Sequence, residues 1–177
     1  MKTLWICPAA ALLLTASPVY ADTTETAGTA VAIALPITAA GIAAYKHDWN
    51  GVIDLGLTTI ATVGTAYALK QIVKERRPDG SDFQSFPSDT SALASSGSSF
   101  LWARYGWQYG LPAFAASSFV SYSRVEAKKH HWYDTAASTV LAIGYSAIFT
   151  PRFSKYRIYS SLDTSPDGAV LRLSYNY

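Results

Sequence analysis

Cysteine is almost absent from this sequence: the 177 residues include only one, Cys7. A chain with one cysteine forms no internal disulfide and no metal centre built from several thiolates. Charge is also scarce, since charged residues make up 15% of the chain and the formal net charge is +2. That balance excludes a nucleic-acid-binding protein that acts through overall positive charge. A hydrophobic content of 50% excludes a disordered chain.

The first residues have the features of a secretory signal peptide. These are a positive charge, an apolar run and a small-x-small cleavage site, found at Lys2, Leu4 to Thr15 and Val19-Tyr20-Ala21. The apolar run is too short for a membrane span, and Cys7 precedes it, where lipid attachment is not expected. We therefore expect residues 1–21 to be removed on export, which leaves a cysteine-free chain suited to an oxidising compartment such as the periplasm.

Apolar stretches of helical length follow the signal segment. The expected helices cover Ala27 to Tyr45, Val52 to Arg77, Thr90 to about Ala103, Pro112 to about Tyr122, and about Trp132 to Phe149. We expect Pro36 to break the first stretch, and the later ones are shorter and rich in Ser, Thr and Gly. These features favour a periplasmic, membrane-apposed protein over one that crosses the membrane several times.

The C-terminal tail changes its period. Tyr156 to Tyr159 and Ala169 to Tyr177 alternate apolar and polar residues around a Ser165-Pro166-Asp167-Gly168 turn, which predicts a β-hairpin laid over the helices. The sequence therefore predicts an all-α helical bundle over residues 22–155 and a hairpin tail over residues 156–177.

Three polar clusters interrupt the apolar helices, and antiparallel packing of neighbouring helices brings them to one end of the bundle. Their cations and candidate helix cap are Lys70, Arg77, Arg124 and Ser88. Three cations beside a helix N-terminus form a site for a dianionic oxyanion. We expect Lys70 and Arg77 to lie two turns apart on one helix. His130 and Asp134 are four residues apart, so the carboxylate can hold one ring nitrogen and leave the other as a nucleophile.

These clusters resemble the three-part signature of the type 2 phosphatidic acid phosphatases, which reads K-x6-RP, PSGH and SR-x5-H-x3-D. Lys70 with Arg77-Pro78 matches the first part, and Ser123-Arg124, His130 and Asp134 match the third. The family shares a helical fold with acid phosphatases and vanadium haloperoxidases.

The resemblance implies a role for each matching residue. Phosphate would be held by Lys70, Arg77, Arg124, Ser88 and the backbone amide at Asp89. His130 would attack phosphorus, and Asp134 would orient His130.

The second part departs from the family signature. Asp89 and Thr90 follow Ser88 where the family has Gly and His, and that His is the general acid which protonates the leaving alkoxide. The hydroxyl of Thr90 is too weakly acidic for this role, and the Asp89 carboxylate would repel phosphate unless it were protonated. His131 and His47 are alternative proton donors.

The sequence thus predicts an exported phosphomonoesterase that acts on a lipid phosphate at a membrane surface through a phosphohistidine. No cofactor, metal ion or nucleic acid is expected, and vanadate is expected to inhibit as a phosphate mimic. Two alternatives remain: a degenerate member that binds phosphate or a phosphorylated lipid without turnover, and a vanadium haloperoxidase. The latter fits less well, because its chemistry also uses the missing His.

Overall fold

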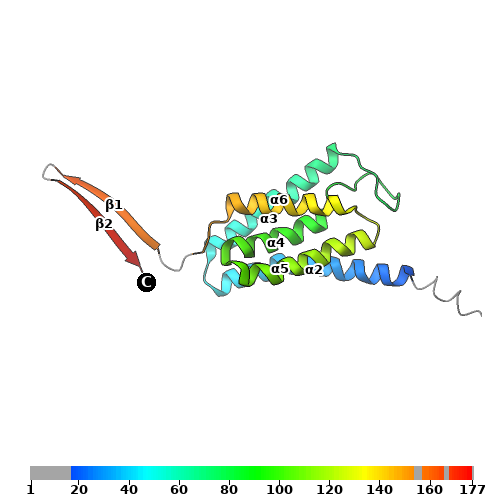
Figure 1. Cartoon of the computed structure of the whole chain (residues 1–177), viewed down its shortest axis with the longest axis horizontal. Helices are drawn as coiled ribbons and strands as arrows, with labels where there is room; N and C mark the ends of the chain where they lie inside the picture. Colours follow the sequence, from blue (N-terminus) through cyan, green and yellow to red (C-terminus); the bar gives the residue numbers. More distant parts are fainter. Residues whose placement is uncertain (1–16, 154–156, 166–167, 177) are drawn as a thin grey trace, which may run out of the picture.

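The computed structural model describes residues 17–153, 157–165 and 168–176, with side chains from 23 to 153. The helices are α2 (Ser17–Tyr45), α3 (Trp49–Ile72), α4 (Asp89–Tyr105), α5 (Trp107–Glu126) and α6 (Trp132–Phe149). Figure 1 shows them as an elongated bundle, which confirms the expected all-α class. Most of the expected signal peptide, residues 1–16, lies outside the described residues, and cleavage after Ala21 stays a prediction.

Helix α4 is the central helix and contacts α2, α3, α5 and α6. Its buried face is made largely of small residues: Ser91, Ala92, Ala94, Ser95, Ser96, Gly97, Ser98 and Ser99. Small residues let helix backbones approach closely, and a Cβ added at Gly97 would lie 2.9 Å from the backbone nitrogen of Pro36. Contrary to expectation, Pro36 does not break the helix. It lies inside the continuous helix α2, at the place where α4 packs against it.

Many hydroxyl side chains are buried in the bundle beside its apolar core, and many large apolar side chains are exposed. Its buried polar residues include Thr58, Thr62, Ser95, Ser117 and Ser138, whereas Ile33, Ile37, Ile60, Leu111, Val140 and Ile148 are exposed. The buried hydroxyls bond one another, as in the contacts of Ser95 with Ser117 (3.1 Å) and Thr139 (3.0 Å). Hydroxyl contacts inside and large apolar side chains outside are typical of helices packed in lipid.

Two of the helices are long enough and apolar enough to cross a membrane, by length and composition: Thr23–Tyr45 within α2, and α3. The 24 residues of α3 extend over about 36 Å, which exceeds the hydrocarbon thickness of about 30 Å. Pro36 does not interrupt the first of these candidate spans, because α2 is continuous through it.

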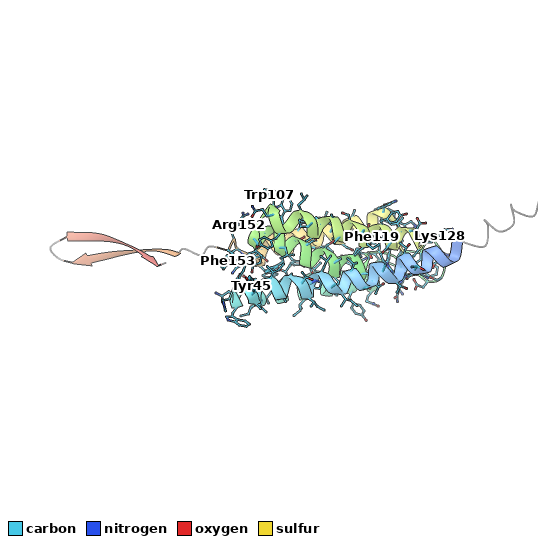
Figure 2. The ribbon with its side chains drawn as sticks, turned by 90° about the horizontal axis from the view of Figure 1, so that it is seen from below. Tyr45, Trp107, Phe119, Lys128, Arg152 and Phe153 are labelled. Carbon is cyan, nitrogen blue, oxygen red and sulfur yellow. The ribbon has the colours of Figure 1, made fainter. Side chains whose placement is uncertain are left out.

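A buried ion pair closes the end of the bundle where α2 turns into α3. Arg104 makes two hydrogen bonds to the carboxylate of Asp48, at 2.8 Å and 2.6 Å. The hydroxyl of Tyr105 donates a third, at 2.8 Å. Burial raises the pKa of Asp48, but its bonds to Arg104, Tyr105 and the Gly51 amide lower that pKa by more. The net pKa is therefore below its ordinary value. In Figure 2 the side chains of Tyr45, Trp107 and Phe153 gather at this end, opposite Lys128.

The chain leaves α3 earlier than the sequence suggests. The helix ends at Ile72, and its C-cap Val73 is extended, so Arg77 is not two helical turns beyond Lys70 as expected. Two backbone hydrogen bonds fold the segment back on itself instead, from Arg77 to the Asp82 carbonyl (3.0 Å) and from Ser85 to the Glu75 carbonyl (3.0 Å). These bonds form only when the loop closes, which is why helical periodicity did not reveal them. Helix α5 also begins five residues before Pro112, at Trp107.

The C-terminal strands are β1 (Arg157–Ser165) and β2 (Gly168–Asn176), which pair antiparallel, with Ser165 opposite Gly168. They contact each other and none of the described helices. The structure therefore confirms the expected helical bundle. It does not support the expected hairpin laid over that bundle.

Candidate active site

Four segments that carry the sequence-selected residues meet at the end of the bundle opposite the Asp48–Arg104 ion pair. They are the loop over residues 73–88, the N-terminus of α4, the loop over residues 127–131 and the N-terminus of α6 (Figure 1). A backbone hydrogen bond joins the two loops: the Asp79 amide donates to the Lys128 carbonyl at 3.0 Å. The Lys129 ammonium also pairs with the Asp79 carboxylate at 2.9 Å. Bonds from Ser81 and Lys129 hold the pKa of Asp79 well below its ordinary value.

His130 is buried, with a relative exposure of 3%, and its ring is held at one nitrogen. Nδ1 lies 2.7 Å from the backbone carbonyl of Ser85 and 3.7 Å from Asp134 Oδ2. A carbonyl only accepts hydrogen bonds, so Nδ1 carries the proton. The unprotonated nitrogen is then Nε2, which makes no hydrogen bond within the described part of the chain. The sequence assigned the orientation of this ring to Asp134 alone, whereas the nearer partner is Ser85.

Asp134 is fully buried in the first turn of α6, and its Oδ2 accepts hydrogen bonds from the Ser85 hydroxyl (2.5 Å) and the His131 amide (2.7 Å). Burial raises its pKa, but the bonds from His130, Ser85 and His131 lower it more, so the net pKa is below its ordinary value.

Ser85 is the functional residue that the sequence reading missed. Its carbonyl contacts His130, and its hydroxyl contacts Asp134 and, at 3.3 Å, Nδ1 of His131. One residue thus fixes both members of the His–Asp pair. The only signal in the sequence was its position three residues before Ser88, because serine is common in loops.

Each expected phosphate-binding cation is paired with its own carboxylate. Lys70 Nζ lies 2.5 Å from Asp89 Oδ2, Arg77 Nε lies 2.7 Å from Asp82 Oδ1, and Arg124 Nη2 lies 2.9 Å from Glu25 Oε1. Lys70 and Arg124 are buried. A bond from the Gln84 amide and the pairing with Arg77 hold the pKa of Asp82 below its ordinary value. The cations therefore lie in a charge-balanced arrangement, with Glu25 and Asp82 as partners that the sequence did not predict.

The N-terminus of α4 lies next to the His–Asp pair. Ser88 is its N-cap, with a hydroxyl that accepts from the Ser91 amide at 3.3 Å, while the Ser88 amide reaches the Asp134 carbonyl at 3.4 Å. Asp89 and Thr90 form the first turn of the helix. Their backbone amides belong to the orphan donors with which a helix N-terminus binds anions. Ser88 therefore caps α4, and its role in phosphate binding stays a prediction, because a hydroxyl that accepts one bond can still donate another.

One group of side chains at this end has donor atoms close enough for a metal ion: Glu75, His131 and Asp134, within 4.8 Å of one another. All three already have partners: the Tyr133 hydroxyl bonds to Glu75, and the Ser85 hydroxyl contacts both Asp134 and His131. The bond to Glu75 raises the pKa of Tyr133 to about 12. The absence of a metal requirement stays a prediction.

No protein-family model matches the chain. A lipid A 4′-phosphatase from Helicobacter pylori is 26% identical over 148 residues, which cover 76% of this chain and 75% of that protein. The crystal structure of Aquifex aeolicus LpxE has the same fold, with a TM-score of 0.59 and 19% identity over 73% of this chain and 82% of that one. Together with the spaced motifs around Lys70 and His130, these similarities support the resemblance to the type 2 phosphatidic acid phosphatase superfamily.

Proposed function

We propose that this protein is a lipid-phosphate phosphatase that works through a phosphohistidine on His130. The observation that carries the proposal is the held imidazole, with Nδ1 tied to Ser85 and Nε2 without a partner in the described chain. It lies at the same end of the bundle as the N-terminus of α4, and the sequence motifs supply three cations for the phosphoryl oxygens, the combination that phosphoryl transfer needs. The similar chain from Helicobacter pylori is a lipid A 4′-phosphatase, and a phosphate carried by a lipid is the substrate class we propose here.

The proposed reaction has two steps. The lone pair of His130 Nε2 attacks phosphorus, the bond from phosphorus to the ester oxygen breaks, and the alkoxide leaves with a proton from a general acid. Water then attacks the phosphohistidine, which releases inorganic phosphate and restores the imidazole. Lys70, Arg77 and Arg124 neutralise the phosphoryl oxygens, and Asp134 stabilises the positive charge that develops on the ring.

This mechanism lacks the proton donor that the family uses. Thr90 lies where the family has a histidine and cannot share its proton near neutral pH. Asp89 is the nearest alternative by position, but it is engaged by Lys70. We therefore propose a phosphatase whose rate depends strongly on the leaving group.

We also propose that the bundle lies in a membrane with its active end at the surface. The candidate spans in α2 and α3 and the exposed Ile, Leu and Val side chains form an apolar exterior. Exposed aromatic residues mark both ends, with Trp132 and Tyr133 at the active end and Trp49 and Trp107 at the other. Aromatic residues collect at membrane–water interfaces. The N-terminal segment supports export and a periplasmic active end.

A second candidate function is phosphate-lipid binding without turnover. The full pairing of the three cations with Asp89, Asp82 and Glu25 favours it, because a phosphate must displace or coexist with these carboxylates.

Phosphate release separates the two functions. The purified protein in detergent is offered phosphatidic acid, a phosphorylated lipid A and p-nitrophenyl phosphate, beside His130→Ala. His47→Ala is the control, since His47 lies in the turn at the opposite end. We expect release by the parent and His47→Ala, and none by His130→Ala. Release by a folded His130→Ala protein at the parental rate would rule out the proposed nucleophile. Vanadate binding without any release would establish the binding function.

A further inference from the structure

Two cavities lie along the seam between α5 and α6. The first has a volume of about 500 Å³ and is lined mainly by Trp102, Phe114, Ile143 and Ala147. The second, of about 360 Å³, is lined mainly by Ser117, Trp132, Thr135 and Thr139. Phe114 lines both cavities, and the α6 residues that line them follow one helix face from Trp132 to Ala147. We refer to the two neighbouring cavities together as the α5–α6 groove.

The groove exists because α4 keeps α5 and α6 apart. The hydroxyl of Ser95 on α4 bonds Ser117 of α5 and Thr139 of α6, and all three helices contribute to the lining, with Ser99 of α4 in the floor of the first cavity. One end of the groove reaches Trp132 and Thr135, which flank the active-end residues His131 and Asp134. The other end reaches Trp102 and Ala147, near the opposite end of the bundle.

The walls of the groove are largely apolar, because most hydroxyls among the lining residues are engaged or buried. The hydroxyls of Ser117 and Thr139 bond to Ser95, and that of Thr135 donates to the Trp132 carbonyl at 2.8 Å. The hydroxyl oxygens of Ser99 and Ser146 are buried away from the cavity surface. Apart from the hydroxyls of Ser118 and Ser121 in the second cavity, the surface is mainly methyl, methylene and ring carbon, which suits hydrocarbon.

The length of the groove matches one acyl chain. From Thr135 to Ala147 helix α6 rises about 18 Å, whereas one leaflet of the hydrocarbon core, and hence one extended acyl chain, is about 15 Å thick. The groove also opens sideways, because Val140 and Ile143 on its rim are exposed. A lipid can therefore enter from the surrounding bilayer.

We propose that one acyl chain of the lipid-phosphate substrate lies in the α5–α6 groove while its phosphate lies at His130. The inference rests on the proposed function and adds the place where the lipid part binds. The occupant follows from position: a largely apolar groove that starts at the first turn of α6, the turn that carries Asp134, and extends for about the length of a leaflet fits an amphiphile with a phosphate at one end. The remote binding energy of the chain would then hold the phosphate ester against the nucleophile.

Two matched substitutions on α6 test the groove. Ile143→Trp fills the first cavity, whereas Ile148→Trp adds the same side chain five residues away, at a position that lines neither cavity. Both isoleucines are exposed, at 49% and 70%, so the folding costs are comparable. We expect kcat/KM for long-chain phosphatidic acid to fall about 10-fold or more in Ile143→Trp, the size of effect that a change of volume has in an apolar pocket. Ile148→Trp should be unchanged, and both should cleave p-nitrophenyl phosphate at the parental rate.

Two results would overturn the proposal: equal losses in the two variants, or a parallel loss on p-nitrophenyl phosphate. If the parent cleaves neither ester, the proposed function fails, and a binding experiment still decides the groove. A phosphatidic acid with a diazirine in one acyl chain is photolysed with the protein in detergent, and labelled peptides are identified by mass spectrometry. Labelling of the α5–α6 groove that excess phosphatidic acid suppresses and phosphatidylcholine does not would support it. Labelling confined to α2 and α3, or labelling that phosphatidylcholine suppresses equally, would show general lipid contact and reject it.

Discussion

Neutralising Asp89 should tighten phosphate binding. Asp89 stands where the family signature has glycine, and its Oδ2 lies 2.5 Å from Lys70 Nζ. The Lys70 side chain is 5% exposed, whereas that of Asp89 is 44% exposed. The carboxylate therefore engages the buried lysine that we expect to hold a phosphate oxygen. Asp89→Asn keeps the shape of the side chain and removes the competing charge.

The size of the effect follows from the charges. Two unit charges 4 Å apart interact with about 4 kcal/mol at the effective dielectric constant of about 20 near a protein surface. Because Asp89 is nearly half exposed, solvent and salt screen most of this, which leaves about 1 to 1.5 kcal/mol. That corresponds to about tenfold tighter binding of a phosphate mimic. The gain should shrink as ionic strength rises.

Calorimetric titration with vanadate measures this gain without requiring turnover. Asp79→Asn is the matched control, because Asp79 pairs with Lys129 at 2.9 Å and Lys129 is not an expected phosphate ligand. We expect Asp89→Asn to bind vanadate about tenfold more tightly and Asp79→Asn to bind it as the parent does. Unchanged or weaker binding in Asp89→Asn would refute the competition between carboxylate and phosphate. Tighter binding with lost turnover would instead identify Asp89 as the proton donor.

Four further predictions follow from the same contacts. Ser85→Ala should lower kcat by about 10-fold or more with little change in KM, measured by steady-state phosphate release, and Ser85→Thr should restore much of it; equal activity in all three proteins would contradict the positioning role. Asp89→Gly with Thr90→His should raise kcat/KM for an alkyl phosphate by about 100-fold or more, and far less for an aryl phosphate, so equal gains would exclude a missing general acid. Arg104→Leu should cost about 3 to 5 kcal/mol in the free energy of unfolding, because it leaves Asp48 buried without its partner; a denaturant titration that shows no loss would contradict this. The pKa of Asp134 is lowered on folding, so its contribution to stability is complete above about pH 4 and is lost as pH falls below that value. Asp134→Asn should flatten that acid dependence of the unfolding midpoint, and an unchanged slope would contradict it.

The sequence by itself determined the class of the fold and the motifs on which the family resemblance rests. Apolar stretches broken by polar turns indicate helices because burial of one face repeats with the helical period. The spacings from Lys70 to Arg77 and from Arg124 to His130 and Asp134 are local properties that can be read directly from the chain. The departure at Asp89 and Thr90 is equally visible, and it carries the leaving-group prediction.

The tertiary structure decided how those residues are held. Glu25 lies 99 residues before its partner Arg124, and Ser85 lies 45 residues before His130, so no local pattern connects them. Helix α3 ends at Ile72 because loop hydrogen bonds replace helical ones, and α2 continues through Pro36 at its close contact with α4. The α5–α6 groove likewise exists only once α4 separates its two walls. Hydrogen bonds and packing between distant segments determine these features, and such contacts have no signature in the spacing of residues along one helix.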